Sequence, residues 1–191
     1  CPSKPVEQAK PVEQATEAPR DVVVDRAMSF YETRAYYERP VVATAVPEGL
    51  VDLRAETCGA CHEEIYQEWS VSTHRRAWLD DAQFQKELEK SRGADDPTRG
   101  DVSWLCVNCH TPVVAQQEKL VVGLTDGRID RPQYERNPTF DEALQRDAVT
   151  CATCHVRDGI VYGPYGDTQA PHPTAKDENL LKVDVCTRCH Q

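Results

Sequence analysis

Four short cysteine motifs constrain this chain more than any other feature of its sequence. Each reads Cys-x-x-Cys-His, and together they use eight of the nine cysteines among 191 residues. This spacing is the attachment signature of c-type haem. Two thiols bond to one edge of the porphyrin, and the next residue presents an imidazole to the iron. The motifs predict haem thioethers at Cys58 and Cys61, Cys106 and Cys109, Cys151 and Cys154, and Cys186 and Cys189.

The histidine that closes each motif is the predicted proximal iron ligand. These four residues are His62, His110, His155 and His190. With six histidines in the chain, finding one directly after all four pairs by chance has a probability on the order of one in a million. The predicted cofactors are therefore four covalently bound haem c groups.

Zinc sites and disulfides are the alternatives for paired cysteines. Zinc does not require a histidine directly after each pair, and a zinc ribbon brings two pairs within about 15–20 residues of each other. Here the pairs begin at positions 58, 106, 151 and 186. The spacing therefore favours haem over both alternatives.

Composition supports the same interpretation and predicts the fold class. Aromatic residues make up 7% of the chain, which is little for an interior built from side chains alone. Four large apolar macrocycles would supply the missing bulk, so the chain without haem should be largely unfolded. No β-rich run is evident. We expect a mainly α fold with extensive irregular loops and little or no β structure, packed around the haems.

Charge and hydropathy limit the possible partners. The formal net charge is −10, which gives nucleic-acid binding no electrostatic basis. It favours redox proteins, or a membrane redox complex, with basic docking surfaces. No apolar run approaches the roughly 20 residues that a membrane-spanning helix needs.

The supply of distal iron ligands is short. Apart from the four proximal histidines, the chain has only His74 and His172, and Met28 is its single methionine. Four haems therefore cannot all have two histidine ligands from this chain. At least one iron should be five-coordinate, water-bound, held by an unusual side chain, or completed by another chain.

Each candidate distal ligand has its own context. His74 lies in a segment that reads as an interrupted helix over residues 62–79. In a continuous helix it would be about 18 Å from His62 along the axis, so it should serve a haem other than that of its own motif. His172 stands between Pro171 and Pro173, which stiffen the backbone. Met28 is a weak candidate, because packing is the commoner role of a methionine.

The start of the chain indicates export and a lipid anchor. Cys1 is the predicted lipidation site of a mature bacterial lipoprotein. Residues 1–20 contain the repeated sequence Lys-Pro-Val-Glu-Gln-Ala and read as a disordered linker. Residues 21–57 should form an N-terminal arm or short helical segment, and residues 58–191 the tetrahaem domain. We expect a periplasmic or cell-surface lipoprotein attached to the inner or outer membrane.

Two further helices are expected. Residues 80–92 place Phe84 and Leu88 on one face of an amphipathic helix, with charges elsewhere. Residues 141–148 read as another short helix. The segment 93–100 should be a polar loop, and residues 159–173, rich in Gly and Pro, should be irregular.

A longer pattern resembles the cytochrome c-554 family of tetrahaem cytochromes over roughly residues 55–191. It reads Cys58-x-x-Cys61-His62-x-x-x-Tyr66-x-x-Trp69-x-x-Ser72-x-His74, with Val149-Thr150-Cys151-x-x-Cys154-His155 and Gly163-Pro164 later in the chain. The resemblance implies a helical fold around closely packed haem pairs. It also implies that His74 ligates a haem other than that of its own motif, and that one haem lacks a distal protein ligand.

Three functions fit these features. The leading hypothesis is a lipid-anchored tetrahaem cytochrome that transfers electrons between redox partners through closely packed haems. The first alternative is an enzyme that acts on a small nitrogen or sulfur species at a five-coordinate haem. The second is a subunit of a larger redox complex or cytochrome wire, in which a neighbouring chain supplies a haem ligand.

Overall fold

The computed structural model describes residues 22–43, 45–93, 95–96, 98–166 and 168–190. Its α-helices are α1 (Val22–Glu32), α2 (Ala55–Gly59), α3 (Glu63–Ser70), α4 (Ala82–Ser91), α5 (Ser103–His110), α6 (Glu142–Gln145) and α7 (Cys151–His155). Single 3-10 turns are η1 (Tyr36–Glu38), η2 (Val114–Gln116), η3 (Thr125–Gly127), η4 (Glu178–Leu181) and η5 (Val183–Val185). The chain is mostly helical with long loops, which confirms the predicted fold class.

The strands form two small sheets, which the sequence analysis did not anticipate. β1 (Lys119–Leu124) pairs antiparallel with β2 (Pro132–Arg136). β3 (Val156–Arg157) pairs antiparallel with β4 (Ile160–Gly163), and β4 pairs parallel with β5 (Thr174–Lys176). Asp158 and Gly159 both have positive φ between β3 and β4, as a two-residue Asp-Gly hairpin requires.

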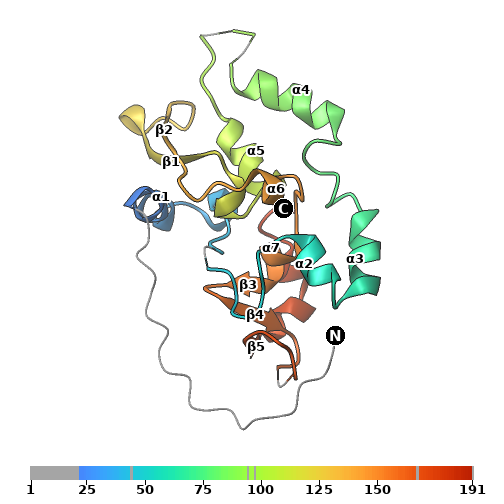
Figure 1. Ribbon diagram of the computed structural model, residues 1–191. Coiled ribbons are helices and arrows are strands. Elements are labelled where there is room, and N and C mark those ends of the chain that lie inside the picture. Colours follow the sequence, from blue (N-terminus) through green and yellow to red (C-terminus); the bar gives the residue numbers. More distant parts are fainter. Residues whose placement is uncertain (1–21, 44, 94, 97, 167, 191) are drawn as a thin grey trace.

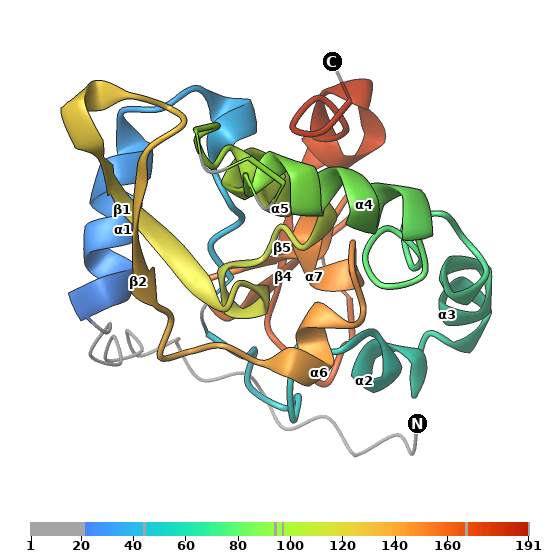
Figure 2. The ribbon, with the colours of Figure 1, turned by 90° about the horizontal axis from the view of Figure 1, so that it is seen from above.

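The first hydrophobic cluster joins α1 to the β1–β2 hairpin, and Figures 1 and 2 show the helix lying along these strands. The successive residues Leu120 and Val121 of β1 are both buried, and a register shift follows between Val121 and Gly123. They pack with Trp104 of α5. The full cluster is Val24, Ala27, Tyr31, Trp104, Val114, Leu120 and Val121.

A second cluster links the N-terminal arm to α6 and α7. Val41 forms an isolated parallel bridge with Val113, and the backbone N–H of Val114 donates to the Val41 carbonyl at 2.9 Å. The arm is thus held within the core. The cluster comprises Val41, Ala43, Leu53, Val113, Leu144, Ala152 and Val156.

The expected helices are present, with shorter bounds. The helix predicted over residues 80–92 is α4, which begins after Asp81, whose carboxylate accepts the Phe84 N–H at 2.8 Å. Leu88 is buried with Trp78 and Ala148 in a third cluster. The segment 62–79 is interrupted as predicted, because α3 ends at Ser70 and turns follow. The helix expected over residues 141–148 is α6 alone.

The predicted lipid anchor and linker belong to the start of the chain. Cys1 and the whole linker predicted at residues 1–20 lie outside the described residues, which begin at Val22. In the part of the chain that the structure does describe, none of the helices has the length and apolar composition to cross a membrane.

Candidate metal centre

Each Cys-x-x-Cys-His motif closes a helical turn. We number the motifs 1 to 4 in chain order; motif 2 ends α5, and motif 3 is the whole of α7. In motif 1 the His62 N–H donates to the Cys58 carbonyl at 3.0 Å, and in motif 4 the His190 N–H donates to the Cys186 carbonyl at 2.9 Å. Residues i, i+3 and i+4 of a helical turn share one face. Each motif therefore turns both cysteine side chains and its imidazole to the same side.

Two of the motif histidines have a fixed ring orientation. The Nδ1 of His110 lies 2.5 Å from the Ala77 carbonyl, and that of His155 lies 2.8 Å from the Tyr162 carbonyl. A carbonyl accepts only, so each Nδ1 carries the proton and each Nε2 keeps its lone pair. This arrangement is typical of metal-bound histidine. The Phe84 ring also stacks on His110 at 3.6 Å between centroids, a contact that the helix pattern did not reveal.

The motifs are brought together in two pairs. The thiols of Cys58 and Cys151 share a hydrogen bond, which lowers the pKa of Cys151 to about 7 and raises that of Cys58. The thiols of Cys109 and Cys189 share another, which lowers the pKa of Cys109 to about 7 and raises that of Cys189. The attachment cysteines of motif 1 thus adjoin motif 3, and those of motif 2 adjoin motif 4.

His74 lies beside the histidine of motif 4. The ring centroids of His74 and His190 are 6.2 Å apart, with 48° between the ring planes. Two metal–imidazole bonds of about 2 Å each, extended by the radius of each ring, span about 6 Å. The separation of the two rings therefore equals the one that two imidazole ligands of a single iron would have.

Trp69 holds the turn that carries His74. Its indole N–H donates at 2.8 Å to the carbonyl of Val149, which lies two residues before Cys151 of motif 3. The Val149 N–H donates back to the His74 carbonyl at 3.2 Å. The Ser72 hydroxyl donates to the Trp69 carbonyl at 2.7 Å and closes the turn. The Trp-Ser-His pattern thus positions an imidazole near a motif more than 100 residues away in sequence.

The other candidate distal ligands are placed differently. His172 lies between β4 and β5, with its Nδ1 3.4 Å from the neighbouring Pro173 carbonyl. Within the described residues it makes no ring contact with another histidine. The side chain of Met28 packs against the cluster that contains Trp104.

Gly59 within motif 1 is in close contact with Tyr66. A Cβ on Gly59 would lie 2.6 Å from the Tyr66 Cγ and 2.9 Å from its Cβ. We expect Gly59→Ala to lower the free energy of unfolding by about 1–3 kcal/mol, because the ring cannot move without its backbone. The control is Gly163→Ala, where a Cβ meets nothing within 4 Å. Guanidinium unfolding of both variants checks this, and equal stabilities would contradict it.

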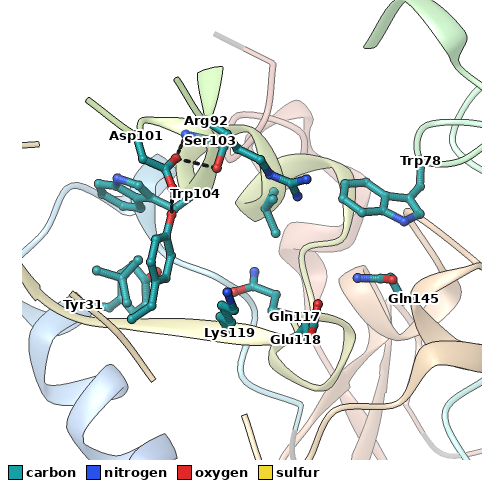
Figure 3. A pocket seen from close by; sticks show the side chains of 13 residues that line it. Tyr31, Trp78, Arg92, Asp101, Ser103, Trp104, Gln117, Glu118, Lys119 and Gln145 are labelled. Carbon is teal, nitrogen blue, oxygen red and sulfur yellow. Dashed lines mark hydrogen bonds between the residues drawn. The ribbon is translucent and has the colours of Figure 1, made fainter. Parts of the chain in front are cut away.

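A polar cavity of about 370 Å³ lies between α5 and the β1–β2 hairpin. Figure 3 shows Asp101 beside Ser103 at one end, with Trp104 and Trp78 on opposite sides. The Ser103 hydroxyl donates to Asp101 at 2.6 Å. Tyr31 also lines the cavity, and burial raises the pKa of its hydroxyl to about 12. Among the motif residues, Val107 alone lines this cavity. The cavity is therefore separate from the face of motif 2 that carries its two cysteines.

The donor set fits c-type haem. Motifs 2, 3 and 4 each offer two thiols and an imidazole on one face, whereas in motif 1 Cys58 is a free thiol and Cys61 is disulfide-bonded. The Nε2 atoms of His110 and His155 are free to bind a metal, and the His74 ring lies near that of His190. Across the part of the chain that is described, His, Cys, Asp and Glu side chains form no cluster of three or more able to hold a metal ion by themselves.

Comparison with known proteins agrees with this chemistry. A family model described as cytochrome c554 and c-prime matches residues 57–156, slightly more than half of the chain. The match contains motifs 1 to 3 and ends before motif 4. No curated protein and no solved structure matches the chain. The chain belongs to the cytochrome c554 and c-prime family, and this membership implies electron transfer by c-type haem.

Proposed function

We propose that the protein is a tetrahaem electron carrier, with one haem attached at each of the four motifs. The observation that supports it best is that all four motifs close the same helical turn, although motif 4 lies outside the family match. Bound haem would supply reversible one-electron chemistry at iron. The chain would supply attachment, axial ligation and spacing.

The contacts between motif cysteines support two haem pairs. Because Cys58 meets Cys151 and Cys109 meets Cys189, porphyrins bonded to these thiols would adjoin at their edges. We propose that motifs 1 and 3 hold one pair and that motifs 2 and 4 hold the other. Such contact favours rapid electron exchange within each pair.

His74 is the proposed distal ligand of the haem at motif 4. Its distance from His190 and the hydrogen bonds that fix its turn support this assignment. His172 is left as the candidate for one further iron, so at least one of the four would lack a histidine on its distal side.

We also propose that the protein is a lipoprotein that meets basic redox partners. Haem c proteins are extracytoplasmic, and acyl chains on Cys1 would hold the domain at a membrane surface. The net charge of −10 would attract basic surfaces. Electron exchange with a basic redox protein should slow as ionic strength rises, because salt screens the attraction. A rate that does not respond to salt would contradict the docking proposal.

Intact-mass spectrometry of the protein from an export-competent host tests haem number and lipid together. We expect the mass of the chain plus four haems and, in the membrane fraction, further mass that a Cys1→Ser variant lacks. Fewer than four haems would overturn the tetrahaem proposal. Equal masses for the wild type and the Cys1→Ser variant, apart from the substitution, would overturn the lipid anchor.

A further inference from the structure

Two arginine side chains lie beside the cysteines of motifs 2, 3 and 4. The Arg157 guanidinium donates to three carbonyls around the C-terminal end of α7, with distances of 3.3 Å to Ala152, 2.9 Å to Thr153 and 2.5 Å to Val156. These bonds fix its positive charge next to Cys154. An arginine keeps this charge even when it is buried.

Arg188 is the second cation, and it stands inside motif 4. Its Nη1 donates to the Arg39 carbonyl at 2.6 Å and to the Pro40 carbonyl at 3.2 Å. Its guanidinium also lies 4.2 Å from the centre of the Tyr36 ring. All of these partners are neutral groups, so they hold the side chain without neutralising it.

Neither guanidinium is ion-paired in the part of the chain that the structure describes. Within the described residues, no ion pair joins Arg157 or Arg188 to an Asp or Glu side chain. Burial and the neighbouring Arg188 charge lower the pKa of Arg157. The positive charges of Arg157 and Arg188 both tend to lower the pKa of the Cys154 thiol, and Arg188 has the same effect on Cys109. Asp158 interacts electrostatically with Arg157, and Asp101 with the Cys106 thiol of motif 2, but neither carboxylate forms an ion pair with Arg157 or Arg188. Motifs 2, 3 and 4 therefore meet around two guanidinium charges that no ion pair of the described residues neutralises.

Negative charge lies beside motif 1. Asp147 is only 9% exposed, and its Oδ2 accepts the Ala55 N–H at 2.8 Å at the start of α2. Asp52 accepts the Arg54 N–H at 2.9 Å and the Thr57 hydroxyl at 2.5 Å. The Asp52 charge interacts electrostatically with the Cys58 thiol of motif 1, and the Asp147 charge with the Cys151 thiol of motif 3.

The cations near these carboxylates are already paired. Arg54 and Arg75 both interact with Asp147. However, Arg54 forms an ion pair with Glu56 at 2.9 Å, and Arg75 forms one with Asp80 at 3.6 Å. The balance of charge around motif 1 therefore remains negative.

We propose that these fixed charges divide the protein into a low-potential end at motif 1 and a high-potential end at motifs 2 and 4. The inference rests on the proposed electron-carrier function. Reduction of iron lowers the positive charge of the haem, so nearby cations stabilise the reduced state and nearby anions stabilise the oxidised state. Motif 3, with Asp147 on one side and Arg157 on the other, would be intermediate.

The test is a spectroscopic redox titration of the haem-loaded protein and two charge variants. Arg188→Gln should lower the potential of the haems at motifs 2 and 4, because it removes the positive charge and keeps a polar side chain. Asp147→Asn should raise the potential of the haems at motifs 1 and 3, and its amide oxygen can still accept from Ala55. We expect each reduction equilibrium to change about tenfold, or about 59 mV for one electron.

Arg99→Gln is the matched control, because Arg99 is exposed and pairs with Asp95 and Asp96. It should leave all potentials in place. If Arg188→Gln fails to retain haem, Arg157→Gln carries the test, with the largest lowering expected at motif 3. Lower potentials in Arg188→Gln and higher potentials in Asp147→Asn, with unchanged potentials in Arg99→Gln, would support the proposal. Potentials that stay unchanged, or shift in the same direction in both charge variants, would overturn it.

Haem content separates this inference from the function on which it rests. A wild-type protein without four titrating haems would contradict the tetrahaem carrier itself. If four haems titrate and their potentials are the same in the wild type, Arg188→Gln and Asp147→Asn, the electron-carrier proposal stands and only the charge-based gradient is overturned.

Discussion

A chain that carries no haem is expected to lose the cooperative fold of the loaded protein. The interior consists of three separate small clusters rather than one continuous core. Large apolar side chains near motifs 1 and 4 remain open to solvent, with exposed fractions of 63% for Ile65, 66% for Leu181 and 78% for Val183. Burial of apolar surface is the main favourable contribution to folding, and porphyrin faces would supply much of it here.

The measurement is a thermal melt followed by circular dichroism on a variant with all eight motif cysteines changed to serine. The wild-type protein, produced and purified in the same way, should unfold with a sigmoidal loss of helicity. The variant should show low helicity and no sigmoidal transition. A cooperative melt near the wild-type midpoint would contradict the idea that haem fills the interior.

His74→Ala is expected to convert one of the four haems from low spin to high spin. The His74 ring lies 6.2 Å from the His190 ring, a separation that suits two ligands of one iron. Removing one imidazole would leave that position open or water-bound, which weakens the ligand field. Electron paramagnetic resonance of the ferric protein counts the two kinds of haem, so the change should appear as the loss of a quarter of the haem from a low-spin signal.

Arg76→Ala is the control for this substitution, since Arg76 is an exposed side chain in the same turn. It should leave the spin states unchanged. Added imidazole should restore the low-spin haem in His74→Ala by entering the space left by the side chain. An unaltered low-spin count in His74→Ala would rule out His74 as the distal ligand of motif 4.

The helices could be predicted where the pattern was local. α4 was predicted from the spacing of Phe84 and Leu88, and the break after α3 from the interrupted pattern of residues 62–79. The β3–β4 hairpin was missed, although Asp158-Gly159 is a strong turn signal, because it lies at the edge of a Gly- and Pro-rich segment that was read as irregular. The β1–β2 hairpin was missed because a bulge near Gly123 breaks its alternation.

The candidate metal centre could likewise be predicted only where its contacts are local in sequence. The Cys-x-x-Cys-His spacing reveals the thiols and imidazole of each motif, because the contacts between them span a single helical turn. The sequence did not reveal the carbonyls of Ala77 and Tyr162 that orient His110 and His155. Any residue can contribute a carbonyl, so no residue type marks the position.

By itself, the sequence determined the attachment chemistry and the shortage of histidines for the distal positions, since both depend only on residue type and short spacing. Tertiary structure alone decided which motifs adjoin, that the His74 ring lies beside that of His190, and that Arg157 and Arg188 lie where motifs 2, 3 and 4 meet. These contacts join residues tens of positions apart. They arise from the packing of the whole chain, and no short window of sequence records them.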